Sequence, residues 1–254
     1  MDTKAVLTQV LKEYEHYLET DPKVDVLYRL LKAGKAGHKQ ALQLAQETGG
    51  SLADSLISAI LPGLGPDETI SVDDALAVIP QALRSNHRYV NEYLAQVQRR
   101  LNESAGIGLQ PVNAAFDETG ARIIAKEVAK DFRKAVKEFK TEVKTFSAHT
   151  VDSSIRANAK AQTEAGLNVT VTRIYDGVGL SNGRTCQWCL DRCGTDMPYS
   201  EAYEKGAFER HPGCGCELLY KVNKRVQRQI DWTSNKWEDV TDEKALEKRK
   251  TYGL

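Results

Sequence analysis

The residues best suited to chemistry are the cysteines, because all five lie between positions 186 and 216 together with one of the five histidines. They form two short groups, a Cys-Gln-Trp-Cys pair followed by a further cysteine, and a later His-Pro-Gly-Cys-Gly-Cys stretch. Two closely spaced ligand pairs joined by a loop have the spacing that tetrahedral zinc prefers. Disulfides are the alternative, but cysteines two apart bridge poorly and an odd count leaves one thiol over. The spacing predicts a metal site.

A structural zinc ion fits this cluster better than a catalytic one. Catalytic zinc keeps one position open and lies beside a general base, as in His-Glu-x-x-His helices or the His-x-Glu pattern of deaminases. Neither pattern occurs in this chain. The weakest candidate ligand is Cys193, whose alternative role is that of a small buried hydrophobic residue. The predicted metal ligands are Cys186, Cys189, His211 and Cys214, with Cys216 competing for one of the four places.

The segments around the cysteines resemble those of a known protein family. A candidate strand and an Asp-containing turn over residues 171–185 precede the first Cys-x-x-Cys pair. The later Arg-His-Pro-Gly-Cys-Gly-Cys at 210–216 resembles the His-Pro-x-Cys-Arg-Cys motif of phage head morphogenesis proteins, the MuF-type minor capsid proteins. The resemblance covers about residues 110–220. Gly215 stands where arginine is usual, no Pro-Pro precedes the histidine, and Cys193 is extra.

This resemblance implies a minor structural protein of a tailed-phage head, and no enzyme. Such a protein would act in the virion, in the capsid interior or at the portal vertex, after assembly in the cytoplasm of a host bacterium. Its expected partners are the portal protein, the major capsid protein or both. Self-association through helices is a further expectation, and zinc is the expected structural cofactor.

Two other classes of function stay open. One is a zinc-dependent nuclease or DNA-binding protein of the treble-clef type, which also uses Cys-x-x-Cys pairs. A nuclease of the His-Asn-His kind needs a catalytic histidine on the strand before the first pair, and residues 168–185 contain none. The other is a phage-encoded toxin or effector, because MuF-type domains can be fused to toxin domains. We expect the 38 residues after Cys216 to leave no room for a separate catalytic domain.

Composition and charge narrow the class of protein. The chain has 254 residues, 41% hydrophobic and 28% charged, so we expect a packed core and no disorder. No apolar run approaches the roughly 20 residues that span a bilayer. No basic-then-apolar leader begins the sequence, so we expect neither a membrane partner nor secretion. Basic and acidic residues balance at 35 each, which argues against a dedicated nucleic-acid coat.

The first 110 residues have the apolar spacing of helices. Asp2 or Thr3 can cap a first helix, and Pro22 can start a second. The glycine pair at 49–50 is predicted to end a third helix, with a separate helix following it. Pro80 should kink or split a later helix, because proline removes one backbone donor and crowds the preceding turn.

Apolar residues repeat at alternating steps of four and three after Pro80, as in a seam for a partner helix. His87 lies on this seam, and a packed or interface histidine is the interpretation that we favour over a metal ligand. The seam consists of Leu83, His87, Val90, Leu94, Val97 and Leu101.

A further amphipathic helix is predicted over 121–146. This window holds eight basic and four acidic residues. A solvated face with internal ion pairs is the first interpretation, and a face toward DNA or an acidic partner is the second. We expect only weak, non-specific DNA contact. The basic stripe consists of Lys126, Lys130, Arg133, Lys134, Lys137, Lys140 and Lys144.

Strand patterns occur only in the third quarter, over 168–175 and 217–222. So small a sheet buries little apolar area, and zinc would hold its loops. The tail is basic from Lys221 to Arg228, and we expect Trp232 and Trp237 to pack onto this domain or a neighbouring copy. The predicted fold is mainly α with a small α+β C-terminal domain. The predicted domains are a helical N-terminal region over 1–110, a long amphipathic helical connector over 111–165, and a MuF-like Cys/His zinc-binding domain over 166–254.

Overall fold

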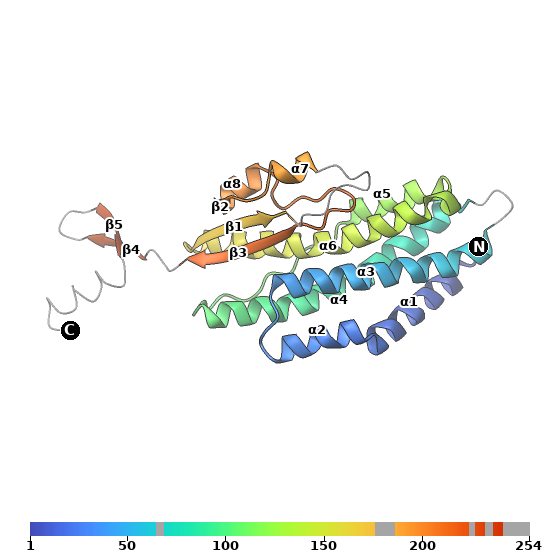
Figure 1. Ribbon diagram of the computed structural model, residues 1–254, viewed down its shortest axis with the longest axis horizontal. Helices are drawn as coiled ribbons and strands as arrows, with labels where there is room; N and C mark the ends of the chain where they lie inside the picture. The colour runs from blue at the N-terminus through green and yellow to red at the C-terminus, as the bar shows by residue number, and fades with distance from the viewer. Residues whose placement is uncertain (65–68, 176–185, 224–226, 232–235, 241–254) are drawn as a thin grey trace.

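The computed structural model describes residues 1–64, 69–175, 186–223, 227–231 and 236–240 (Figure 1). As predicted, the chain is mainly helical, with a small α+β part at its C-terminal end. No described helix is both long and apolar enough to cross a membrane. The helical body consists of α1 (Thr3–Thr20), α2 (Pro22–Lys32), α3 (His38–Ile60), the short 3₁₀ helix η1 (Leu61–Gly63), α4 (Val72–Ser104), α5 (Glu118–Ala129) and α6 (Phe132–Glu164).

Several helices begin where the sequence predicts. The Asp2 side chain accepts a hydrogen bond from the Ala5 amide and caps α1. Asp21 caps α2, with Pro22 at its first position, where the missing N–H leaves no helical bond unmade. Such signals are local, which is why the sequence alone predicts them.

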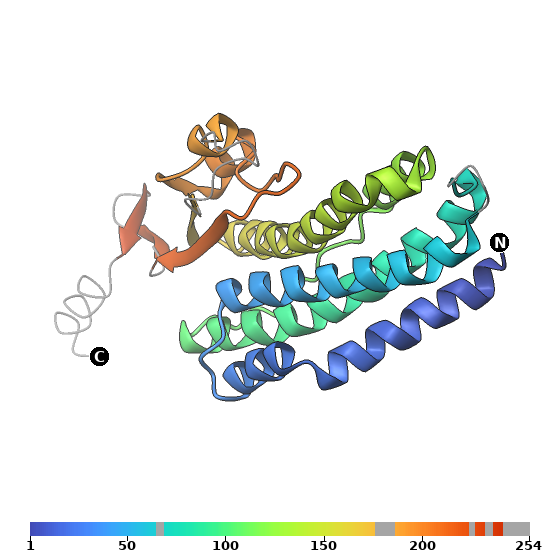
Figure 2. The same ribbon diagram turned by 45° about the vertical axis from the view of Figure 1, so that its right-hand side comes forward.

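The C-terminal part contains a three-stranded antiparallel sheet in the order β2-β1-β3. Its strands are β1 (Asn168–Ile174), β2 (Asp196–Pro198) and β3 (Glu217–Asn223), and its helices are α7 (Gln187–Leu190) and α8 (Tyr199–Glu204). This confirms the two predicted strands, and β2 was not predicted. The sheet, α7 and α8 lie together along one side of α6 (Figures 1 and 2).

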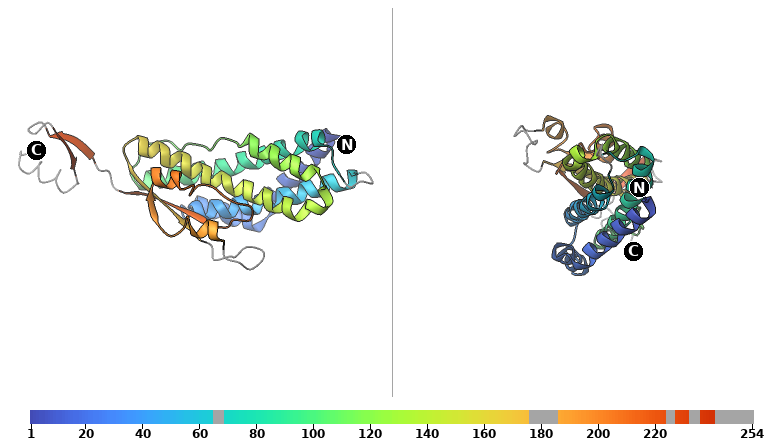
Figure 3. Two further views of the ribbon diagram at one scale, coloured as in Figure 1. Left: turned by 90° about the horizontal axis from the view of Figure 1, so that it is seen from above. Right: turned by 90° about the vertical axis from the view of Figure 1, so that its right-hand side faces the viewer.

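A separate antiparallel pair follows β3. It consists of β4 (Gln227–Asp231) and β5 (Lys236–Val240). The N-terminus lies at the opposite end of the molecule from this pair (Figure 3). Trp237 falls within β5, whereas Trp232 lies outside the described residues. The predicted packing of the two tryptophans therefore stays a prediction.

The core has two large apolar clusters. One joins side chains of α1, α3, α4, α5 and α6. The other joins α2, α3, α4 and α6 to β1, β2, α8 and β3, so the sheet and the helices share a core. Residues of all three predicted domains contribute to this second cluster. The domain boundaries themselves stay a prediction.

The predicted seam on α4 packs against helices of the same chain. Leu83 belongs to the first cluster, and Val90, Leu94 and Val97 belong to the second. His87 is buried and hydrogen-bonds with the Thr150 hydroxyl and the Ala114 carbonyl oxygen, as expected for a packed histidine. A seam of this kind needs a partner helix, and here α3 and α6 supply it.

The prediction that the glycine pair ends a helix is wrong, because α3 continues through Gly49 and Gly50 to Ile60. The glycines lie where α3 packs on α6. A Cβ added to Gly49 would be 2.5 Å from Ser147 Oγ and 3.3 Å from Lys144 Cα. The missing side chain lets the helices approach closely, and this packing outweighs a helix-propensity cost of about 1 kcal/mol.

Alanine substitutions at the neighbouring positions Gly49 and Gly50 should have different effects on stability. Gly49→Ala should lower the free energy of unfolding by about 1–3 kcal/mol, because the methyl group would overlap α6. Gly50→Ala is the matched control, since its Cβ would meet only Lys144 side-chain atoms at 3.7 Å or more. That change should be neutral or stabilise by up to about 1 kcal/mol. Urea unfolding followed by circular dichroism measures both, and equal effects would contradict the close approach.

Pro80 was predicted to kink or split its helix, and a split is absent, because α4 is one helix from Val72 to Ser104. Pro80 is buried, and the Gln81 side-chain amide donates to the Ala77 carbonyl at 2.6 Å. Packing of the buried ring offsets the loss of one backbone hydrogen bond, and α4 continues through the proline.

The single helix predicted over 121–146 is instead two helices. The first, α5, ends at Ala129, and the Asp131 side chain caps α6 by accepting from the Lys134 amide. The break places the ring of Phe132, which is fully buried, 5.8 Å from that of Phe139. Apolar periodicity missed it because both helices contribute to one buried face.

Candidate metal centre

Two short segments carry the sulfur and nitrogen atoms of the cluster. Cys186 is the N-cap residue of α7 and Cys189 lies within that helix, so a single helical turn directs both thiols the same way. The second segment is a turn before β3, closed by a hydrogen bond from the Cys214 amide to the His211 carbonyl. Gly213 makes this turn possible, because its φ of +76° lies in the left-handed region.

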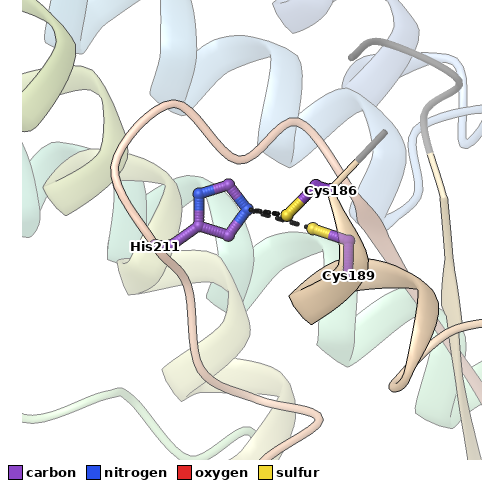
Figure 4. A group of neighbouring side chains, drawn as sticks. All are labelled: Cys186, Cys189 and His211. Atoms are coloured by element: carbon purple, nitrogen blue, oxygen red, sulfur yellow. Dashed lines mark hydrogen bonds between the residues drawn. The ribbon is translucent and has the colours of Figure 1, made fainter. Parts of the chain in front are cut away.

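The side chains of the two segments meet, as Figure 4 shows for Cys186, Cys189 and His211. The Nε2 atom of His211 lies 3.2 Å from the Cys186 sulfur and 3.1 Å from the Cys189 sulfur. The Cys189 and Cys214 sulfurs are 3.8 Å apart. Zinc–sulfur bonds of about 2.3 Å in a tetrahedron place two sulfurs about 3.8 Å apart, so this pair has the spacing of a zinc site.

Five predicted ligands fall into two groups whose ligand atoms lie within 4.8 Å of one another. The first is Cys186, Cys189 and His211, and the second is Cys189, Cys214 and Cys216. Cys189 belongs to both, so the groups form one continuous cluster. Among the described residues, Cys193 belongs to neither group, and it is less buried than the other four cysteines.

Four of the five cysteines are buried, and the thiols are not joined in disulfides. All five cysteines lie in the described part of the chain, and none forms a disulfide. Cys186, Cys189, Cys214 and Cys216 are each at most 6% exposed and make a small core of their own. Burial raises the pKa of Cys189 to about 12. A hydrogen bond from Cys216, with help from Arg173 and Arg210, lowers the pKa of Cys214 to about 4.

His211 is oriented for binding through one ring nitrogen. Its Nδ1 lies 2.9 Å from the Pro212 carbonyl oxygen, to which it can donate, so the Nε2 lone pair faces the sulfurs. The ring also makes an edge contact with Trp188 at 5.4 Å, and the Arg192 guanidinium lies over Trp188 at 4.2 Å. These Cys and His groups are close enough to bind a metal ion, and their buried sulfur donors and half-buried imidazole nitrogen suit a soft or borderline metal.

A buried ionic network next to the sulfurs was missed by the sequence reasoning. Arg173 of β1, Asp152 of α6 and Arg210 have side chains at most 1% exposed. Asp152 Oδ2 lies 2.6 Å from Arg210 Nε and 3.8 Å from Arg173 Nη1. Burial raises the pKa of Asp152, and the two guanidinium groups oppose that rise.

One signal in the sequence pointed to this network. Val169, Val171 and Arg173 alternate along β1 on its buried face, so the pattern placed an arginine where an apolar residue belongs. An arginine is almost never fully buried without a partner. Its partner could not be read from the sequence, because Asp152 lies on a different element.

A scan against models of protein families found no match, and searches of curated proteins and of solved structures found none either.

Proposed function

We propose that this chain is a minor structural protein of a tailed-phage head, built around a structural zinc ion. The observation that supports this proposal best is the meeting of two motifs in one cluster with buried sulfurs. These motifs, His-Pro-Gly-Cys and Cys-x-x-Cys, are the ones that give the resemblance to MuF-type proteins. The cluster stands beside a helical body with which the sheet shares its core. Such a unit suits a rigid assembly component.

Zinc is the metal that this donor set favours. Cysteine thiolates with one imidazole in a tetrahedral arrangement are typical of closed structural zinc sites. Purified protein should contain about one zinc per chain, which elemental analysis measures. A metal-free protein that is nevertheless folded over residues 186–216 would contradict the zinc centre.

The proposed partners are the portal protein, the major capsid protein or both, at the capsid interior or portal vertex. Because the α4 seam packs against helices of the same chain, self-association would have to use other helical faces. The test first asks whether portal and major capsid genes lie beside this gene, and then co-expresses the chain with their products and isolates particles. The chain should sediment with particles or with the portal, and a chain that stays free in every combination would overturn the proposal.

DNA should be a weak partner. Three lysines of the basic stripe already pair with acids: Lys130 with Glu127, Lys134 with Asp131, and Lys140 with Asp54. A site that neutralises about three phosphates should give a log–log salt slope of about −2.7. Fluorescence anisotropy over a salt series measures this slope. A much steeper slope, or nanomolar affinity at physiological salt, would make DNA a principal partner.

Incubation of DNA with the protein and added divalent metal tests the nuclease alternative. We expect no cleavage, because β1 carries no histidine that could act as the base.

A further inference from the structure

The buried network of Arg173, Asp152 and Arg210 makes direct contact with the metal cluster. Arg173 Nη2 donates to the Cys214 sulfur at 3.1 Å, and Arg210 Nη1 donates to the Cys214 carbonyl oxygen at 3.0 Å. Both arginines therefore hold the same residue, one by its side chain and one by its backbone. Asp152 joins the two guanidinium groups to α6.

Other contacts fix Arg173 in place. Its Nη1 donates to the Ala207 carbonyl at 2.6 Å, and its guanidinium carbon lies 5.5 Å from the centre of the Trp188 ring. Because the side chain is fully buried, it has little freedom to turn toward another acceptor. The hydrogen bond to the Cys214 sulfur is thus built into the fold.

The charges of the network and of a zinc centre are complementary. Two arginines and one aspartate leave one net positive charge, buried beside Cys214. A divalent ion with three thiolates and one neutral imidazole carries one net negative charge. Together they are neutral, which matters because an uncompensated buried charge is strongly unfavourable. A zinc ion with four thiolates would carry two net negative charges, so one negative charge would stay uncompensated beside the network.

We propose that Arg173 is a positioning residue of the metal centre, which selects Cys214 as the third thiolate ligand and links the centre through Asp152 to α6. In this arrangement the ligands are Cys186, Cys189, His211 and Cys214, and Cys216 donates a hydrogen bond to Cys214 from outside the ligand set. This inference rests on the proposed zinc centre and adds to it the residue that sets its charge and its ligand choice.

The first test removes the guanidinium group. Arg173→Met keeps the apolar length of the side chain and should weaken zinc and cobalt(II) binding about 10–100-fold, the usual loss when an outer partner of a metal ligand is removed. Arg156→Met is the matched control, because it removes an α6 arginine whose ion pair with Glu209 is solvent-accessible. Competition with a chromophoric chelator measures the affinity. Equal affinities for the two variants would overturn the role of Arg173.

The second test counts thiolates and stays informative if Arg173→Met does not fold. Sulfur-to-cobalt charge-transfer absorption grows with the number of bound thiolates, so Cys214→Ser should lose about one third of it. Cys216→Ser should keep the full absorption. The reverse result, with the loss in Cys216→Ser, would show that Cys216 is the ligand and would overturn the inference while leaving the zinc centre intact.

The two proposals fail in different ways. If the wild-type chain binds neither zinc nor cobalt(II), the metal centre falls and the role of Arg173 falls with it. If the wild type binds metal and the variants give the opposite ranking, only the role of Arg173 is lost.

Discussion

Replacing both Cys186 and Cys189 by serine should abolish metal binding and unfold mainly the region after about residue 165. These two residues are candidate ligands from one turn of α7, and Cys189 is shared by both groups, so the double substitution removes the residue that joins them. The free energy of metal binding at such a site contributes directly to the stability of the fold. Structural zinc contributes about 10–16 kcal/mol in small zinc-finger peptides. Even a fraction of that exceeds what a three-stranded sheet can supply.

Hydrogen exchange followed by mass spectrometry can locate the change. Amides in 186–216 should exchange fastest, whereas those of α3 and α4 should stay protected, because the helical body has an apolar cluster that excludes the sheet. Cys193→Ser is the control, since Cys193 lies outside both ligand groups and its loss should be mild. If the double variant kept metal and wild-type protection, the site assignment would be wrong.

The metal cluster could be predicted because its ligands are close in sequence and rare in composition. The five candidate ligands lie within one short stretch, and the type and spacing of cysteine and histidine indicate the chemistry directly. The network that supports them could not be predicted in the same way. Asp152 is 58 positions from Arg210, and only the packing of α6 against the turn before β3 brings them together.

The helices show the same division between local and tertiary causes. A cap at Asp2 or Thr3 and a helix start at Pro22 were predicted, and the structure has the cap at Asp2, because a side chain that bonds an amide three residues on is a local event. Gly49 was misread, because glycine at a helix end and glycine at a helix crossing look alike in sequence. The absence of a Cβ at Gly49 matters because Ser147, on another helix, lies where that Cβ would be.

Leu94→Asp should unfold the helical body. Leu94 is 1% exposed within the cluster that joins α2, α3, α4 and α6 to the sheet. Truncating a buried leucine alone costs about 2–5 kcal/mol. An unpaired carboxylate placed there adds a desolvation penalty, so the total should exceed about 4 kcal/mol, a large part of the roughly 5–15 kcal/mol that holds a domain together.

The control lies on the same seam. Leu101 continues the four-and-three repeat but is 36% exposed, so Leu101→Asp should change the free energy of unfolding by no more than about 0.5 kcal/mol. Thermal melting and size-exclusion chromatography of the two variants distinguish an internal seam from an assembly surface. An internal seam requires that Leu94→Asp melts early or aggregates while Leu101→Asp behaves like wild type. If Leu94→Asp stayed folded with an unchanged melting temperature and lost only its association with a partner, α4 would present this face to another chain.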